Sequence, residues 1–221
     1  MYLIGDVHAN IGKYRKILKS LPEGSKSIQL GDMGLGFAGV HLHPVMPGHM
    51  FIRGNHDDPK ACQKNPAYLG EYGYLPFEDI FYMGGAWSID YMYRTPGVSW
   101  WPDEELSAQQ LESAWELYCK AKPKIVVTHE APLVAGLWML SQCTLPKTPP
   151  DALCNVAKDE NYDKYKKELG QKETRTGRKL QDMLDVHVPD KWFFGHYHKS
   201  ETFSMRGCEF RCLAELELGE V

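Results

Sequence analysis

Five short apolar runs in this sequence each end in a turn that carries aspartate, asparagine or histidine, and this repeated pattern constrains the fold most. The runs have the length and the β-branched or aromatic content of strands. In chain order the turns are Gly5-Asp6-Val7-His8, Gly31-Asp32-Met33-Gly34, Gly54-Asn55-His56-Asp57, the single residue His129, and Gly195-His196-Tyr197-His198. Because ligand sites in layered α/β folds lie at strand ends, we expect these side chains to meet in one site.

Helical periods separate several of the strand-like runs. Apolar residues fall on one helical face within segments 11–21, 111–118 and 180–184. Strand-length runs occur at 1–4, 27–30, 50–53, 80–83, 124–128, 192–194, 200–205 and 208–213. No repeat or Gly/Ser/Pro-rich linker divides the chain, so we expect one α/β (α+β) domain over residues 1–221. Segments 91–106 and 143–176 fit neither pattern and are predicted to be loop insertions.

The donor groups at these turns indicate a metal site. They are imidazoles, carboxylates and one carboxamide, a set that suits manganese, iron, cobalt, nickel or zinc better than calcium or magnesium. In an extended Asp-x-His or His-x-His triplet both side chains lie on one face and can reach one centre. Two neighbouring ions need a bridging ligand, which a carboxylate supplies. Gly-Asp and Gly-Asn are also ordinary turn dipeptides, but turn chemistry does not explain five histidines.

The order and spelling of the five blocks resemble the calcineurin-like metallophosphoesterase superfamily, including its bacterial and phage-type phosphatases. That signature runs GDxH, GDxx, GNHD, a single histidine near a strand end, then GHxH, and the resemblance spans Gly5 to His198. It implies a four-layer αββα sandwich of two mixed β-sheets flanked by helices, with a dinuclear metal site at the strand ends. It also implies that Asp32 bridges two ions. The ligands implied for one ion are Asp6, His8, Asp32 and His198, and those for the other are Asp32, Asn55, His129 and His196.

The same resemblance implies an activity. Two divalent ions, Mn²⁺ first and Fe, Zn, Ni or Co as alternatives, would share a bridging hydroxide that attacks a phosphate-ester substrate. His56 matches the histidine of GNHD, which protonates the leaving group as an imidazolium supported by an acidic partner. Asp57 either orients a neighbouring side chain or stabilises the turn. We expect a phosphomonoesterase, with a phosphodiesterase or nuclease as the alternative and a protein-binding scaffold without catalysis as a remote one.

Substrate contacts are less well defined by the sequence. The Ser/Thr protein phosphatase branch has GDxVDR and GNHE, whereas this chain has GDMGLG and GNHD, so that identity is not favoured. Arg175, just before a predicted helix, is either a phosphate clamp or a surface residue. Arg53 is expected to be buried in its strand. Tyr93, Arg94, Trp100 and Trp101 form either an aromatic rim for a nucleotide or packing anchors for a loop.

The other histidines carry no predicted chemistry. His41 and His43 form an HxH in a loop rich in Gly and Pro, and no carboxylate accompanies them closely. With His49 they could form a separate metal site, but exposed loop residues are the favoured interpretation. His187 ends a helical pattern and is expected to cap that helix or to lie at the surface.

Charge and hydropathy limit the possible partners. The chain has 25 Lys+Arg against 29 Asp+Glu, a net charge of −4, which argues against a long electrostatic footprint for duplex nucleic acid. Nucleic acid or a nucleotide therefore stays possible as a substrate only. No apolar run approaches the roughly 18 residues of a membrane span. The first residues have no signal-peptide pattern, so a cytoplasmic protein is expected. The oligomeric state is left open.

Overall fold

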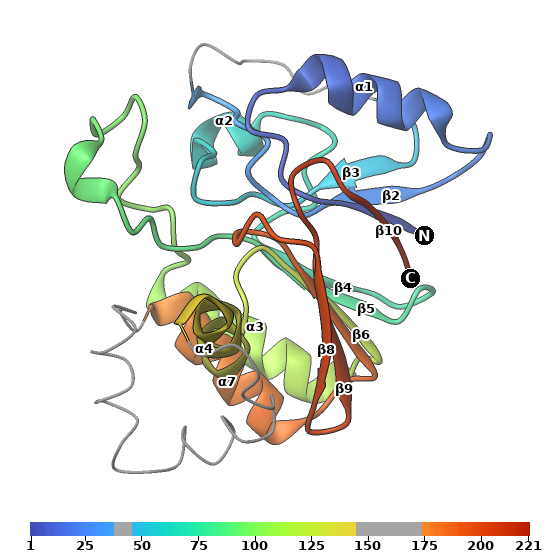
Figure 1. The fold of residues 1–221 in the computed structure, drawn as a ribbon, viewed down its shortest axis with the longest axis vertical. Coiled ribbons are helices and arrows are strands. Elements are labelled where there is room, and N and C mark those ends of the chain that lie inside the picture. The colour runs from blue at the N-terminus through green and yellow to red at the C-terminus, as the bar shows by residue number, and fades with distance from the viewer. Residues whose placement is uncertain (38–45, 145–173) are drawn as a thin grey trace.

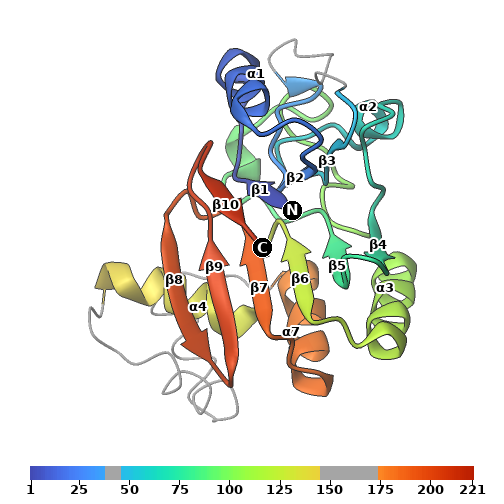
Figure 2. The same cartoon turned by 90° about the vertical axis from the view of Figure 1, so that its right-hand side faces the viewer.

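The computed structural model describes residues 1–37, 46–144 and 174–221, and it contains two β-sheets packed face to face (Figures 1 and 2). The smaller sheet has the strand order β10-β1-β2-β3. Its strands are β1 (Tyr2–Ile4), β2 (Ser27–Gln29), β3 (His49–Phe51) and β10 (Leu218–Glu220). β1, β2 and β3 are parallel to one another, and β10 pairs antiparallel with β1.

The larger sheet has the order β4-β5-β6-β7-β9-β8. Its strands are β4 (Tyr72–Leu75), β5 (Ile80–Met83), β6 (Ile125–Thr128), β7 (Lys191–Phe194), β8 (Glu201–Met205) and β9 (Cys208–Cys212). The four central strands are parallel, and the edge strands β4 and β8 are antiparallel to their neighbours. Both sheets are therefore mixed, as the sequence predicted.

Helices cover the two outer faces of this pair of sheets. α1 (Ile11–Ser20) and α2 (Pro59–Gln63) lie against the smaller sheet, and α3 (Ala108–Ala121), α4 (Leu133–Thr144) and α7 (Arg175–Val186) lie against the larger one (Figures 1 and 2). The predicted αββα sandwich is thus confirmed. None of the helices in the described ranges is long and apolar enough to cross a membrane.

Three apolar layers hold the four structural layers together, and the alternation of side chains along the strands produces them. In β1, Leu3 packs between the sheets while Ile4 packs against α1. In β6, Val127 packs between the sheets while Val126 packs towards the helices. Strands buried on both faces read as continuous apolar runs, which explains why they were recognisable in the sequence.

Some elements differ from the prediction. The third strand is His49–Phe51 rather than 50–53, and β4, β10, α2 and α4 were not predicted. α4 is apolar on nearly every side, so it lacks the one-sided period that identifies a surface helix. Segment 91–106 is a connection that includes the short 3₁₀ helix η2 (Tyr91–Tyr93). His41, His43 and residues 145–173 of the predicted insertion lie outside the described residues.

Candidate metal centre

The ends of five strands, drawn from both sheets, bring the predicted donors together. Asp6 follows β1, Asp32 follows β2 and Asn55 follows β3, while His129 and His196 follow β6 and β7 of the larger sheet. Parallel strands within each sheet place these ends at a common edge. Asp6, Asp32, Asn55 and His129 are buried, so they are held away from bulk water.

The backbone at this edge is in an unusual conformation. Four of the predicted donor residues have left-handed backbone angles, with φ of 44° at His8, 54° at Asp32, 67° at His196 and 53° at His198. Such angles are uncommon for residues with a Cβ atom and concentrate at functional sites. The turns therefore hold these four residues in strained backbone conformations at the strand ends.

Two glycines of the repeated blocks are required by close packing. A Cβ atom at Gly54 would overlap the Asp32 carboxylate and the His129 ring, and one at Gly195 would overlap the Asp6 carboxylate. Gly31 has a φ of 97°, so it supplies the sharp turn that the sequence suggested. The glycines thus let the backbone approach the charged side chains closely.

Asp6, His8, Asp32 and His198 form the first group of donors. One potential ligand atom from each lies within 4.8 Å of all the others. The Nε2 atoms of His8 and His198 are 2.8 Å apart, and His198 Nε2 lies 3.3 Å from Asp6 Oδ2. Two carboxylates and two imidazoles facing one point are a suitable site for a divalent transition ion.

A second group of donors adjoins the first. His129 Nε2 lies 3.3 Å from Asp32 Oδ1 and 3.1 Å from Asn55 Oδ1. His196 Nδ1 lies 3.0 Å from the same Asn55 oxygen. The His129 Nδ1 atom is 2.7 Å from the Leu30 carbonyl oxygen, so it donates there and leaves Nε2 facing the other donors.

Asp32 belongs to both groups. Its Oδ1 atom faces His129 and accepts a hydrogen bond of 2.8 Å from the backbone N–H of His56. Its Oδ2 atom lies 3.9 Å from His8 Nε2 and 3.9 Å from His56 Nε2. The Oδ1 atom of Asp32 thus faces the second group, and the Oδ2 atom faces the first.

The electrostatics of these groups favour bound positive charge. Burial alone would lower the pKa of His129, but the Asp32 carboxylate raises it to about 10. Burial would raise the pKa of Asp32, yet His129 holds that pKa well below its usual range. Burial and the nearby His129 charge lower the pKa of His196 to about 4. A proton on His129 thus balances the Asp32 carboxylate, and a divalent ion could take the place of that proton, so the donor set fits the metals that the sequence suggested.

Asn55 is oriented by a chain of hydrogen bonds that sequence reasoning missed. Its Nδ2 donates to Ser88 Oγ over 3.1 Å, and that hydroxyl donates to Glu104 Oε2 over 2.6 Å. Glu104 also accepts the backbone N–H of Ser88 at 2.8 Å. The amide nitrogen is therefore turned away from the second group and the amide oxygen towards it. Ser88 follows Gly84 soon after the end of β5, so the sequence offered a sixth polar strand end from which its place near the site could have been predicted.

Asp57 stabilises two turns through hydrogen bonds with their backbone N–H groups. It is buried, and it accepts hydrogen bonds from the N–H groups of Gly34 at 2.7 Å, Leu35 at 3.0 Å and Gly54 at 2.8 Å. Burial and the neighbouring Asp32 charge raise its pKa to about 6. Of the two roles considered for Asp57, these contacts favour the turn-stabilising one.

His56 lies beside the donors. Its ring centroid is 5.1 Å from that of His8, and its Nδ1 and Nε2 atoms lie 3.0 Å and 2.9 Å from the guanidinium nitrogens of Arg94. The Asp32 carboxylate is the acidic group near the ring. Burial lowers the pKa of His56, and the Arg94 charge adds to this effect while Asp32 opposes it.

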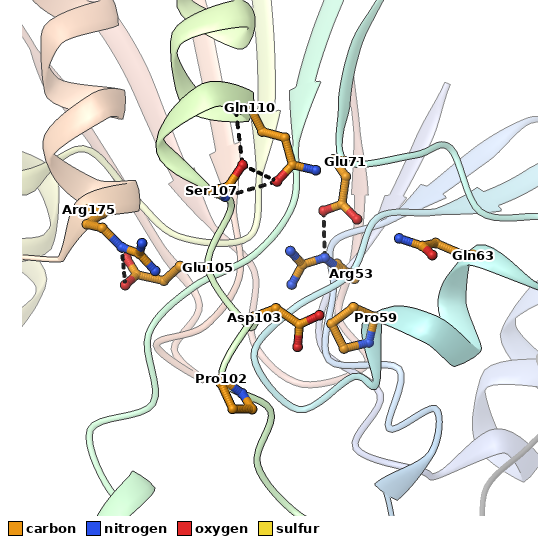
Figure 3. Close-up of a pocket in the computed structure, with 10 residues that line it drawn as sticks. All are labelled: Arg53, Pro59, Gln63, Glu71, Pro102, Asp103, Glu105, Ser107, Gln110 and Arg175. Atoms are coloured by element: carbon orange, nitrogen blue, oxygen red, sulfur yellow. Dashed lines mark hydrogen bonds and ion pairs between the residues drawn. The ribbon is translucent and has the colours of Figure 1, made fainter. Parts of the chain in front are cut away.

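Arg175 lies away from the two donor groups, beside Glu105. Its side chain is 57% exposed and its Nε is 3.3 Å from Glu105 Oε2, at a cavity of about 210 Å³ that Figure 3 shows. None of the seven predicted metal donors lines that cavity. Arg53, also at this cavity, is buried as expected and bonds Glu71 over 2.7 Å.

The remaining predicted residues are mostly structural. Trp101 is buried, and Trp100 lies 5.6 Å from the ring of Tyr91, so both tryptophans act as packing anchors, whereas Tyr93 is exposed. His49 is buried in β3 with its Nδ1 2.8 Å from Ser27 Oγ.

His187 is the C-terminal cap residue of α7, one of the two positions predicted for it. Its Nε2 donates to the Pro123 carbonyl oxygen over 2.9 Å.

Comparison with known proteins gives a family match. The calcineurin-like phosphoesterase family model matches residues 1–200. No curated protein matches the chain. Among solved structures, a conserved uncharacterized protein from Streptococcus pneumoniae TIGR4, titled a predicted phosphoesterase, is 12% identical with a TM-score of 0.36, covering 97% of this chain and 72% of its own. The phosphopantetheinyl hydrolase of Mycobacterium tuberculosis is 14% identical with a TM-score of 0.44, covering 97% and 89%. Because the family model spans most of the chain and includes all five polar strand ends, the chain belongs to the calcineurin-like phosphoesterase family.

Proposed function

We propose that this protein is a phosphatase that hydrolyses phosphomonoesters at the two adjoining donor groups, with the whole chain acting as one catalytic domain. The observation that carries the proposal is the position of Asp32, which turns one carboxylate oxygen towards each group while His56 lies at its edge. A carboxylate so placed suits a bridge between two ions.

The proposed ligands follow the two groups. One ion is held by Asp6, His8, Asp32 and His198, and the other by Asp32, Asn55, His129 and His196. Mn²⁺ is our first candidate because imidazole, carboxylate and carboxamide donors suit it, and Fe, Zn, Ni or Co are compatible. When bound, two such ions supply a water activated near neutral pH and neutralise charge on the phosphoryl oxygens.

The chain itself supplies the general acid. As the bond between phosphorus and the ester oxygen breaks, the departing oxygen takes a proton from the His56 ring, which afterwards regains one from solvent. Burial lowers the pKa of His56 in the free protein, and the Arg94 charge adds to this effect while the Asp32 charge opposes it. An incoming phosphate anion favours the imidazolium, so substrate binding and protonation of His56 support each other.

The complete set of seven donors and His56 supports catalysis over a scaffold role. The test compares p-nitrophenyl phosphate with bis(p-nitrophenyl) phosphate in the presence of Mn²⁺, using the chelated protein and His129→Ala as negative controls. His187→Gln is the matched histidine control. We expect monoester hydrolysis that is lost on chelation and in His129→Ala. Hydrolysis of the diester alone would replace this proposal with a phosphodiesterase, and hydrolysis of neither ester would favour the scaffold.

A further inference from the structure

A loop between β5 and α3 brings an arginine to the candidate general acid. This loop contains η2 and projects from the body of the molecule (Figure 1, green). Arg94 follows η2, yet its side chain is only 11% exposed because it turns back towards His56. Asp90 holds it in place through two contacts, Nε to Oδ1 at 2.7 Å and the terminal nitrogen NH2 to Oδ2 at 2.9 Å.

The groups that face Arg94 do not match all of its donors. A guanidinium only donates hydrogen bonds, and a neutral imidazole accepts with one ring nitrogen. Two guanidinium nitrogens nevertheless lie within 3.0 Å of the two ring nitrogens of His56. One of these two contacts with the ring therefore has no acceptor, although NH1 also donates to the Ser99 carbonyl oxygen over 3.3 Å and NH2 to Asp90. An anionic oxygen at the same place would match both the charge and the planar pair of donors.

The position of this unmatched donor is informative. His56 Nε2, which faces Arg94, is also 3.9 Å from the Asp32 oxygen that belongs to the first donor group. Arg94 is thus separated from the proposed ion site by one imidazole ring. Arg175, the clamp suggested by the sequence, is instead paired with Glu105 at the separate cavity of Figure 3.

We propose that Arg94 binds a non-bridging oxygen of the substrate's phosphoryl group and thereby favours monoesters over diesters. A monoester presents three non-bridging oxygens with up to two negative charges, whereas a diester presents two oxygens with one charge. The guanidinium of Arg94 therefore attracts the phosphoryl group of a monoester more strongly than that of a diester. Asp90 acts as a positioning residue that holds the guanidinium towards His56. This inference rests on the proposed phosphatase function, but phosphate binding tests it without turnover.

The experiment measures binding of inorganic phosphate to the full-length, Mn²⁺-loaded protein by isothermal titration calorimetry. The variants are Arg94→Ala, Arg94→Lys and Asp90→Asn, and Arg15→Ala on the exposed side of α1 removes an equal charge as the matched control. We expect Arg94→Ala to weaken phosphate binding about 10- to 100-fold, with Arg94→Lys intermediate because it keeps the charge without the fork. Asp90→Asn is expected to weaken it by a smaller factor.

Kinetics provide the second measurement. For p-nitrophenyl phosphate, Arg94→Ala is expected to lower kcat/KM about tenfold or more, mostly through KM, while the bis ester changes by less than about threefold. Circular dichroism and metal content verify the fold of each variant, and Arg94→Lys replaces Arg94→Ala if the latter does not fold. Unchanged phosphate affinity in a folded Arg94 variant would overturn the inference. If the wild type hydrolyses neither ester, the phosphatase proposal fails, and phosphate affinity still decides the role of Arg94.

Discussion

The imidazole rings of His8 and His198 meet with their Nε2 atoms 2.8 Å apart, although the residues are 190 positions apart in the chain. The rings are nearly perpendicular, with an interplanar angle of 83°. One of the two Nε2 atoms must carry a proton for this contact to be a hydrogen bond. Asp6 Oδ2 also lies 3.3 Å from His198 Nε2, so a carboxylate oxygen adjoins the two ring nitrogens. A divalent ion replacing that proton would bind to both rings and the carboxylate.

Loss of His198 is therefore expected to remove one ion and spare the other. We predict that His198→Ala binds one Mn²⁺ per chain rather than two, measured by elemental analysis after gel filtration. The gain in Tm on adding Mn²⁺ should shrink, because fewer ions bind the folded state. His187→Gln, which changes a helix-capping histidine, is the control and should keep both ions. Two ions in His198→Ala would contradict the assignment.

Loss of His56 is expected to slow turnover without changing metal content. We predict that His56→Ala lowers kcat about 10²- to 10⁴-fold on an alkyl phosphate, because a poor leaving group needs a proton. The effect on p-nitrophenyl phosphate should be smaller, since nitrophenolate leaves readily without one. Steady-state kinetics on the two substrates measure this difference. Loss of metal from His56→Ala, or equal effects on both substrates, would remove His56 from the role of general acid.

The polar strand ends were sufficient to predict which side chains meet, and the family resemblance that they carry implied the four layers. Each donor stands within a few residues of a strand end, and parallel pairing in each sheet then brings distant turns such as those of Asp32 and His129 together. The expectation that these side chains meet needed no knowledge of side-chain conformations, because ligand sites in layered α/β folds lie at strand ends.

Contacts made by the connection between β5 and α3 could not be predicted in the same way. Arg94 and Glu104 reach the site through an irregular segment whose path follows from tertiary packing, such as the burial of Trp101. Neither periodicity nor a turn motif identifies where such side chains point. The sequence therefore suggested Arg175 as the phosphate contact, whereas the guanidinium beside His56 belongs to Arg94.

The hydroxyl of Ser88 is expected to affect metal affinity through Asn55. Without it the Asn55 amide loses the acceptor that turns its oxygen towards His129 and His196. We predict that Ser88→Ala weakens binding of one of the two ions about 10- to 100-fold, measured by competition with a chelating dye. Ser20→Ala, at the exposed end of α1, is the serine control. If Ser88→Ala binds both ions as tightly as the wild type does, the hydrogen bonds from Asn55 through Ser88 to Glu104 do not position Asn55.

Glu130 is expected to make the stability of the protein fall as pH rises. Burial raises the pKa of Glu130 to about 8 from an ordinary value of 4.5, and the neighbouring Glu105 charge adds to this shift although the hydroxyl of Thr174 opposes it. Between these two values the folded protein keeps a proton that the unfolded chain releases. The free energy of unfolding should therefore decrease through this window, by at most about 1.4 kcal/mol per pH unit. Glu130→Gln stays neutral and keeps an acceptor for Thr174, so its stability relative to the wild type should increase from about pH 5 to pH 8. Urea denaturation of both proteins in the presence of chelator measures the free energy of unfolding at each pH. If its plots against pH run parallel for the two proteins across that range, Glu130 is ionised in the folded protein.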